Sequence, residues 1–160
     1  MEVKLTPIGV VQTTASEDEI RSGRGRAEAV IEIYEMFEDA LDGVEGFSHI
    51  FVLAYFHKLR PEQIGPLRVK PRGLLRHGFK LEELPTLGVF ALDSPTRPNP
   101  VGLTLARLIR REGRNLLVAG LDYFDGTPVL DVKPYQPQYR AEDYTFPKWY
   151  TKLHEKAGHV

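Results

Sequence analysis

Residues 48–57 read Ser-His-Ile-Phe-Val-Leu-Ala-Tyr-Phe-His, an almost continuous run of apolar and aromatic side chains. This composition predicts a central β-strand of a sheet. Upstream, residues 5–13 and 26–34 are predicted strands, and the second alternates between apolar and polar side chains as a half-buried strand does. Downstream, further strands are predicted over residues 88–92, 115–124 and 129–132, whereas residues 101–110 fit either a helix or a strand.

The segments between these strands carry few helical signals. Residues 35–41 predict one or two helical turns, residues 17–26 a loop, and residues 143–156 a C-terminal helix. Residues 58–85 hold four prolines and three glycines, which predicts a long loop, and loops of this length are often functional. Several short strands with little helix predict a mainly β, single-domain fold, closed as a barrel or sheet. No strand leads through a glycine-rich turn into a helix, which argues against a Rossmann cofactor site.

The composition of the 160 residues bounds the function. A formal net charge of −1 gives no global attraction to nucleic acid, so such a partner would need a local basic patch. The chain has no cysteine, which excludes disulfides, thiolate zinc sites and a cysteine nucleophile. The first residues lack the apolar run of a signal peptide, and no stretch is long enough to span a bilayer. We therefore expect a cytoplasmic protein without a membrane partner.

The first segment that could carry chemistry is Asp93-Ser94-Pro95-Thr96-Arg97-Pro98-Asn99-Pro100-Val101-Gly102. Its three prolines fix backbone dihedrals and remove donors, so it is predicted to be a stiff loop. Such a loop holds Ser94, Arg97 and Asn99 in set directions, which suits recognition of a carboxylate, a phosphate or a base edge. A structural turn in which Arg97 pairs with an acid explains the same residues equally well.

The second segment runs from Leu121 to Tyr135. Asp125-Gly126 is a strong turn signal between two apolar runs, and on chemistry alone a plain hairpin is the favoured interpretation. Aspartates and tyrosines nevertheless gather near the predicted strand ends, and this lining suits a cationic ligand such as a sulfonium. These residues are Asp122, Tyr123, Asp125, Asp131 and Tyr135.

A local excess of positive charge lies between His57 and Lys80, where a single acid, Glu62, faces seven basic residues. They are Lys58, Arg60, Arg68, Lys70, Arg72, Arg76 and Lys80. A solvated surface loop and a patch that contacts phosphates are both consistent with this excess. The five histidines do not form a metal set, so no metal is expected; His57 is kept as a site residue because it stands where the apolar strand enters the loop.

Four stretches resemble the TrmO-type methyltransferases, also called TsaA-like or YaeB-like proteins (UPF0066). They are Ile8–Val11, Gly46–Ile50, Gly88–Ala91 leading into Ser94–Leu103, and Leu121–Asp122 leading through Asp125–Pro128 to Asp131–Tyr135. Their order and spacing cover most of residues 5–137. The family usually has Thr-Arg directly before Ser-Pro, where this chain has Leu92 and Asp93, which reverses a charge.

The resemblance implies a TsaA-like β-barrel over residues 1–137, with residues 138–160 as a C-terminal tail or helix. It also implies a homodimer that binds S-adenosylmethionine and tRNA, and N6-methylation of threonylcarbamoyladenosine next to the anticodon. Two alternatives stay open: a methyltransferase of this fold that acts on a small molecule or another RNA, and a barrel that binds S-adenosylmethionine or RNA without catalysis.

The resemblance and the residue chemistry together assign the expected site residues. The cofactor contacts are His57, Lys58, Asp93, Ser94, Arg97, Asn99, Leu103, Asp122, Tyr123, Phe124 and Asp125. Asp125, Asp131 and Asp93 are the expected proton acceptors in catalysis. The expected substrate contacts are Arg68, Lys70, Arg72, Arg76, Lys133 and Tyr135.

Overall fold

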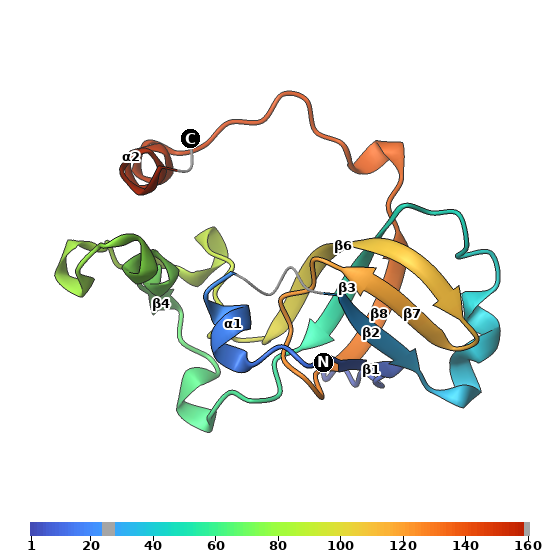
Figure 1. The fold of residues 1–160 in the computed structure, drawn as a ribbon. Coiled ribbons are helices and arrows are strands. Elements are labelled where there is room, and N and C mark those ends of the chain that lie inside the picture. Colours follow the sequence, from blue (N-terminus) through green and yellow to red (C-terminus); the bar gives the residue numbers. More distant parts are fainter. Residues whose placement is uncertain (24–27, 159–160) are drawn as a thin grey trace.

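The computed structural model describes residues 1–23 and 28–158, and it confirms the predicted β-barrel (Figure 1). Six antiparallel strands close in the order β1-β2-β7-β6-β3-β8. They are β1 (Gly9–Gln12), β2 (Glu28–Ile33), β3 (His49–Tyr55), β6 (Val101–Glu112), β7 (Asn115–Ala119) and β8 (Pro128–Pro134).

Strand β3 lies between β6 and β8, as its apolar sequence predicts. Its alternate residues Ile50, Val52 and Ala54 point into the barrel and are fully buried. They meet inward residues from the other strands, including Val11, Ile31, Leu116, Val118 and Val129. Because one face of each strand fills this core, register is fixed by the alternation of apolar and polar side chains.

Two of the predicted elements are wrong. The expected loop at residues 17–26 contains helix α1 (Glu17–Arg21), which begins at a capping box: the Ser16 side chain accepts from the Glu19 N–H, and the Glu19 side chain accepts from the Ser16 N–H. Arg26 lies outside the described residues. The expected strand at residues 88–92 is only β5 (Leu87–Gly88), followed by the 3₁₀ turn η5 (Val89–Ala91).

Strand β6 confirms one of the two alternatives for residues 101–110, whereas β7 is shorter than the predicted strand. Residues 101–110 belong to β6, and the pairing of β6 with β7 has an irregularity between Leu108 and Arg110. The strand expected to reach Phe124 ends at Ala119, because Gly120 has a φ of 88°.

Residues 58–92 form a small lobe beside the barrel; a long loop was predicted over residues 58–85 of it. This lobe contains η2 (Pro61–Gln63), η3 (Arg72–His77), η4 (Leu81–Glu83) and a pair of short strands, β4 (Arg68–Val69) with β5. Its core, Leu74, Phe79 and Leu84, is completed by Leu153 and Ala157 of helix α2 (Lys148–Ala157). The C-terminal helix therefore exists, but it begins at Lys148 instead of Asp143.

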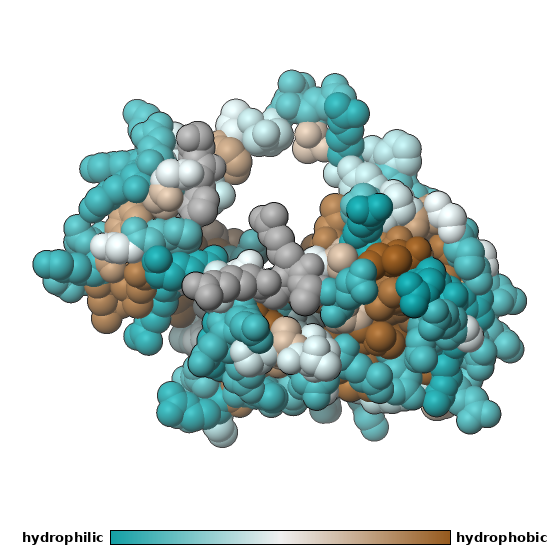
Figure 2. Space-filling model, in the orientation of Figure 1, coloured by the Kyte–Doolittle hydropathy of each residue, from teal (hydrophilic) through white to brown (hydrophobic). Residues whose placement is uncertain are grey.

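Two further turns follow strands of the barrel. Residues 35–41 form the predicted helical turns as η1 (Glu35–Leu41), and η6 (Pro137–Tyr139) follows β8 before the chain crosses to the lobe (Figure 1). Figure 2 shows apolar side chains over the barrel and again over the lobe. Within the described residues, no helix has both the length and the apolar character needed to cross a membrane.

Candidate functional site

The first cavity lies where the proline-rich loop enters β6, and we call it the barrel cavity. Its volume is about 540 Å³. It is lined by Phe56, Phe90, Asp93, Arg97, Asn99, Val101, Gly102, Leu103, Thr104, Asp122 and Tyr123.

Glycine at position 102 makes the floor of the barrel cavity possible. A Cβ atom built on Gly102 would lie 2.6 Å from the Phe56 ring and 2.8 Å from the Tyr123 ring. The two rings meet edge to face, with centroids 6.0 Å apart. The floor is therefore aromatic, and no larger residue fits at position 102 unless these rings move.

Asp122 and Tyr123, which are adjacent in the chain, have different electrostatic roles in this cavity. The Thr104 hydroxyl donates to Asp122 Oδ1 at 2.5 Å, which fixes the direction of the carboxylate. The buried Tyr123 hydroxyl donates to the Val52 carbonyl oxygen at 2.9 Å, and burial raises the pKa of Tyr123 well above its usual value. Asp122 therefore supplies negative charge, whereas Tyr123 stays neutral and is not available as a base.

Arg97 stiffens the loop that forms the opposite wall. Its Nη1 donates to the backbone oxygens of Leu92 at 3.2 Å and Ser94 at 3.3 Å. The structural alternative predicted from the sequence paired Arg97 with an acidic side chain. In the structure, both of these hydrogen-bond partners are backbone carbonyl groups. Because these bonds add to the restrictions of the prolines, the loop holds Asp93 and Asn99 at the rim of the cavity.

A second cavity of about 400 Å³, the α1 cavity, adjoins the first and shares Phe56, Asp93, Asp122 and Tyr123 with it. Its other lining residues are Ile20, Arg21, His57, Lys58, Leu59, Gln63, Arg76, Pro95, Thr96, Phe124 and Thr127.

Helix α1 is held over this second cavity by three polar contacts. Lys58 Nζ lies 2.6 Å from Glu17 Oε1, and the Arg21 guanidinium lies 4.9 Å from the centroid of the Phe124 ring. Arg76 Nη1 donates to the Arg21 carbonyl at 2.6 Å, which joins α1 to the lobe. The hydrogen bond from Lys58 lowers the pKa of Glu17, so this pair stays charged near neutrality.

His57 lies beside this pair. Partial burial, reinforced by the charge of Lys58, lowers the pKa of His57 from its ordinary value of 6.5, although Glu17 acts in the opposite direction. The imidazole is therefore neutral at pH 7.

Most predicted cofactor contacts line one of the two cavities; Ser94 and Asp125 do not. The Asp125 Oδ1 atom accepts the backbone N–H of Thr13 at 2.9 Å and faces a separate hollow. Asp131 also faces away, and its carboxylate lies 3.3 Å from Lys133 Nζ. Of the three expected proton acceptors, only Asp93 lines the cavities.

The hairpin interpretation of Asp125-Gly126 is wrong. The turn exists, since the Thr127 N–H bonds the Phe124 carbonyl at 3.1 Å. The strands on its two sides do not pair, however: β7 pairs with β2 and β6, and β8 pairs with β1 and β3.

Most of the predicted substrate contacts hold the protein itself together. Arg68 donates to the Thr86 carbonyl, and Lys70 Nζ donates to the carbonyls of Leu81 and Leu84 at 3.0 and 2.8 Å. Tyr135 packs against Phe51, with ring centroids 5.8 Å apart. Arg72 is exposed at the start of η3, and among these residues it is the one best placed to meet a phosphate group.

Sequence reasoning missed several lining residues. Phe56 and Thr104 lie in strands or beside them and carry no motif that marks them as functional. Ile20 and Arg21 depend on α1, which the Ser16–Glu19 spacing of the capping box could have revealed. Trp149 and Tyr150 of α2 line a third cavity.

Comparisons with known proteins identify the family of the chain. The sequence profile described as the tRNA-methyltransferase O N-terminal domain matches residues 19–141. A probable S-adenosyl-L-methionine-binding protein of Pyrococcus abyssi is 34% identical over 150 residues, which are 91% of this chain and 75% of that protein.

Two further comparisons involve longer proteins. The tRNA (adenine(37)-N6)-methyltransferase of mouse is 43% identical over 107 residues, 67% of this chain but 23% of the mouse protein. The crystal structure of TrmO from Pseudomonas aeruginosa is similar with a TM-score of 0.69 and 30% identity, over 91% of this chain and 61% of that chain. The present chain thus spans less than two thirds of both proteins.

Proposed function

Because the chain belongs to the family of the tRNA-methyltransferase O N-terminal domain, we propose that it is an S-adenosylmethionine-dependent methyltransferase that modifies N6 of an adenosine in tRNA. The adenosine is proposed to be the threonylcarbamoylated one next to the anticodon. The observation that carries the proposal is the pair of adjoining cavities, in which Asp93 and Asp122 face an aromatic floor.

The residues present fit S-adenosylmethionine. The Asp122 carboxylate, oriented by Thr104, suits a positively charged ligand, and the rings at the floor add cation–π attraction. The Phe56 and Tyr123 rings, which lie close to Gly102, offer aromatic carbon against which a purine can pack. When bound, S-adenosylmethionine supplies a methyl group on a sulfonium.

The protein's part in the reaction is to position the acceptor and receive a proton. The N6 lone pair forms the new nitrogen–carbon bond, the electrons of the old methyl–sulfur bond pass to sulfur, and N6 loses its proton. A carbamoyl-linked N6 is a poor nucleophile, so placement and proton removal both matter. Asp93, at the rim shared by the cavities, is the proposed acceptor of this proton.

Two copies of the chain are proposed to form the working unit. Leu103 and Leu105 of β6 are 65% and 44% exposed, and they lie in register with Leu53 and Phe51 of β3 on the outer face of the barrel. An apolar surface of this kind is typical of faces that another protein covers.

A cytoplasmic location stays a prediction.

Cofactor affinity is expected to fall below pH 6.5, as His57 becomes protonated. The pKa of His57 is lowered in the folded protein. The contribution of neutral His57 to the stability of the folded state is therefore complete above pH 6.5, and it is lost as the pH falls through the lowered pKa. A second cation beside Lys58 would also repel a cationic cofactor. Calorimetric titrations between about pH 5 and pH 8 measure the effect.

Two variants give this prediction its control. His57→Gln is expected to flatten the pH dependence, whereas His49→Gln, which changes a histidine outside both cavities, should behave as the unmodified protein does. An unchanged pH profile in His57→Gln would show that another group titrates.

The Arg72→Ala variant is expected to weaken tRNA binding and to reduce the salt dependence of that binding. Loss of one phosphate contact lowers the slope of log affinity against log salt by about 0.9. Arg110→Ala, which removes an exposed arginine that pairs with Glu112 at the far end of β6, is the matched control. Filter binding at several salt concentrations measures both slopes, and equal slopes would argue against RNA at η3.

Labelled cofactor distinguishes the proposed function from its rivals. The purified chain is given labelled S-adenosylmethionine and tRNA, with and without threonylcarbamoyladenosine. Label in the modified tRNA alone supports the proposal. Cofactor binding without transfer to any tRNA would favour a non-catalytic barrel or a small-molecule acceptor.

A further inference from the structure

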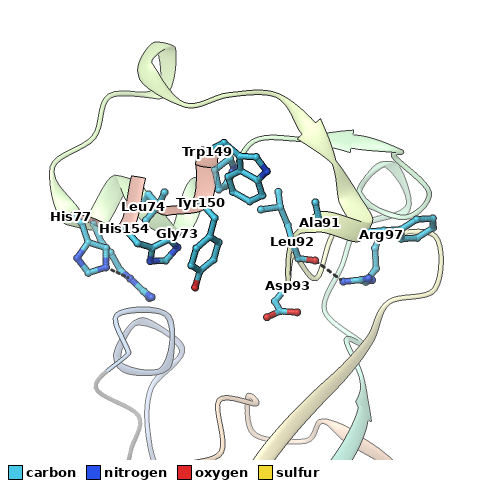
Figure 3. A pocket seen from close by; sticks show the side chains of 13 residues that line it. Gly73, Leu74, His77, Ala91, Leu92, Asp93, Arg97, Trp149, Tyr150 and His154 are labelled. Atoms are coloured by element: carbon cyan, nitrogen blue, oxygen red, sulfur yellow. Dashed lines mark hydrogen bonds between the residues drawn. The ribbon is translucent and has the colours of Figure 1, made fainter. Parts of the chain in front are cut away.

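The third cavity, which we call the α2 cavity, lies between helix α2 and the segment that runs from η3 to the proline-rich loop (Figure 3). Its volume is about 560 Å³. Trp149, Tyr150 and His154 line it from α2. Because Phe90, Asp93 and Arg97 line both this cavity and the barrel cavity, the two spaces adjoin.

A stack of aromatic rings begins just before α2 and continues along one face of the helix. Phe146, Tyr150 and His154 follow at intervals of four residues, with ring centroids 4.5 Å and 3.9 Å apart and planes 16° and 21° apart. Trp149 meets Tyr150 edge to face, at 5.7 Å and 71°, so its indole stands outside this stack. Figure 3 shows Trp149 close to Leu92, on the side of the cavity that leads to Asp93 and Arg97.

The position of α2 is fixed by its other residues. Leu153 and Ala157 pack on the lobe core of Leu74, Phe79 and Leu84. Lys156 Nζ lies 3.1 Å from Glu83 Oε1 and 4.7 Å from the centroid of the Phe79 ring. Trp149, Tyr150 and His154 form the aromatic wall of the cavity. Apolar packing and the charge of Lys156 together hold this wall in place.

The helix also carries positive charge on a separate face. Lys148, Lys152 and Lys156 recur every four residues, and all three are exposed. The repeat is offset from the aromatic repeat by two residues, which places the two rows on opposite sides of the helix. One side of α2 thus offers rings, and the other offers contacts for phosphate groups.

We propose that the α2 cavity receives the adenine base of the acceptor nucleotide, stacked on Trp149, while Lys148 and Lys152 of α2 contact neighbouring phosphates. This inference rests on the proposed function and adds a binding site to it. Single-stranded bases are commonly bound by stacking on aromatic side chains. The family match ends at residue 141, so the aromatic wall belongs to a part of the chain that the match does not cover. Asp93, shared with the barrel cavity, lies where the base and the cofactor would meet.

Tryptophan fluorescence tests the proposal directly, because Trp149 is the only tryptophan in the chain. The protein is first saturated with S-adenosylhomocysteine and then titrated with an anticodon stem-loop RNA that carries the acceptor nucleotide. The same RNA with an abasic site at that position is the control. We expect additional quenching with the acceptor RNA and none with the control. Equal responses, or complete quenching by S-adenosylhomocysteine alone, would overturn the proposal, the latter because the cofactor's own adenine would occupy the cavity.

Substitution supplies a second, independent readout. Trp149→Ala is expected to raise the KM for RNA about tenfold or more, from the loss of one base-stacking contact, without changing cofactor affinity. Trp149→Phe should retain most of the affinity for RNA. Tyr144→Ala, which removes an exposed aromatic residue outside the cavity, is the matched control.

The outcomes separate this inference from the proposed function. Quenching by the acceptor RNA without methyl transfer would leave the base site intact and reject the methyltransferase. Methyl transfer with an unchanged KM in Trp149→Ala, or a change in cofactor affinity alone, would overturn the base site and leave the methyltransferase intact.

Discussion

Replacement of Asp122 by asparagine is expected to weaken S-adenosylmethionine binding about 10- to 100-fold. Asp122 lines both the barrel cavity and the α1 cavity, and Thr104 fixes the direction of its carboxylate. Asparagine keeps the shape and an oxygen for Thr104 but removes the negative charge, and hydrogen bonds to charged groups contribute about 1.5–3 kcal/mol. Calorimetric titration with the cofactor measures the loss.

The control for this substitution is Asp39→Asn, which changes an exposed aspartate of η1 and should leave the affinity unchanged. Thermal unfolding of both variants confirms that they fold. If Asp122→Asn bound the cofactor normally while Asp125→Asn lost it, the cofactor would bind at Asp125 and not in the cavities that Asp122 lines.

Substitution of Gly102 by alanine is expected to affect stability and binding together. The added methyl group would enter the space that the Phe56 and Tyr123 rings occupy, and overpacking of this kind costs about 1–3 kcal/mol. For a chain of this length, each kcal/mol lowers the unfolding midpoint by about 2–4 °C. Movement of the rings would also disturb the cavity floor and weaken cofactor binding.

Gly88→Ala is the matched control for the loss of a glycine, because a Cβ at position 88 meets no atom within 4 Å. Differential scanning calorimetry and cofactor titration of the two variants give the comparison. A Gly102→Ala protein with normal stability and normal affinity would show that the rings do not form the floor of a binding site.

The barrel could be predicted from the sequence because its signals are local and repeated. Ile50, Val52 and Ala54 alternate with outward residues along β3, and residues 28–33 repeat the pattern. Because one face of each strand fills a common core, buried and exposed side chains alternate along the strand. The strands can therefore be predicted from neighbouring residues alone.

Which strands pair with one another could not be predicted from the alternation of side chains. Asp125-Gly126 has the composition of a hairpin turn, yet the strand that follows it pairs with β1 and β3. A turn signal states that the chain reverses locally, but which strand lies beside another depends on contacts between distant residues.

The candidate site was predictable in part, and mostly through resemblance to a family. Asp93, Arg97, Asn99 and Asp122 do come together, but Asp125 and Asp131 face other parts of the surface. A count of basic residues likewise could not reveal that Lys70 is occupied by two carbonyl groups of the lobe.

We infer that the adjoining cavities bind the reactants for transfer of a methyl group from S-adenosylmethionine to N6 of an adenosine in tRNA. Mass spectrometry of nucleosides, released from tRNA after incubation with the protein and a cofactor that carries a deuterated methyl group, tests it most directly. We predict the deuterated methyl group on threonylcarbamoyladenosine, and a much smaller amount of it with Asp122→Asn at a cofactor concentration that does not saturate this variant. A deuterated methyl group on any other nucleoside, or on none while the cofactor binds, would contradict the account.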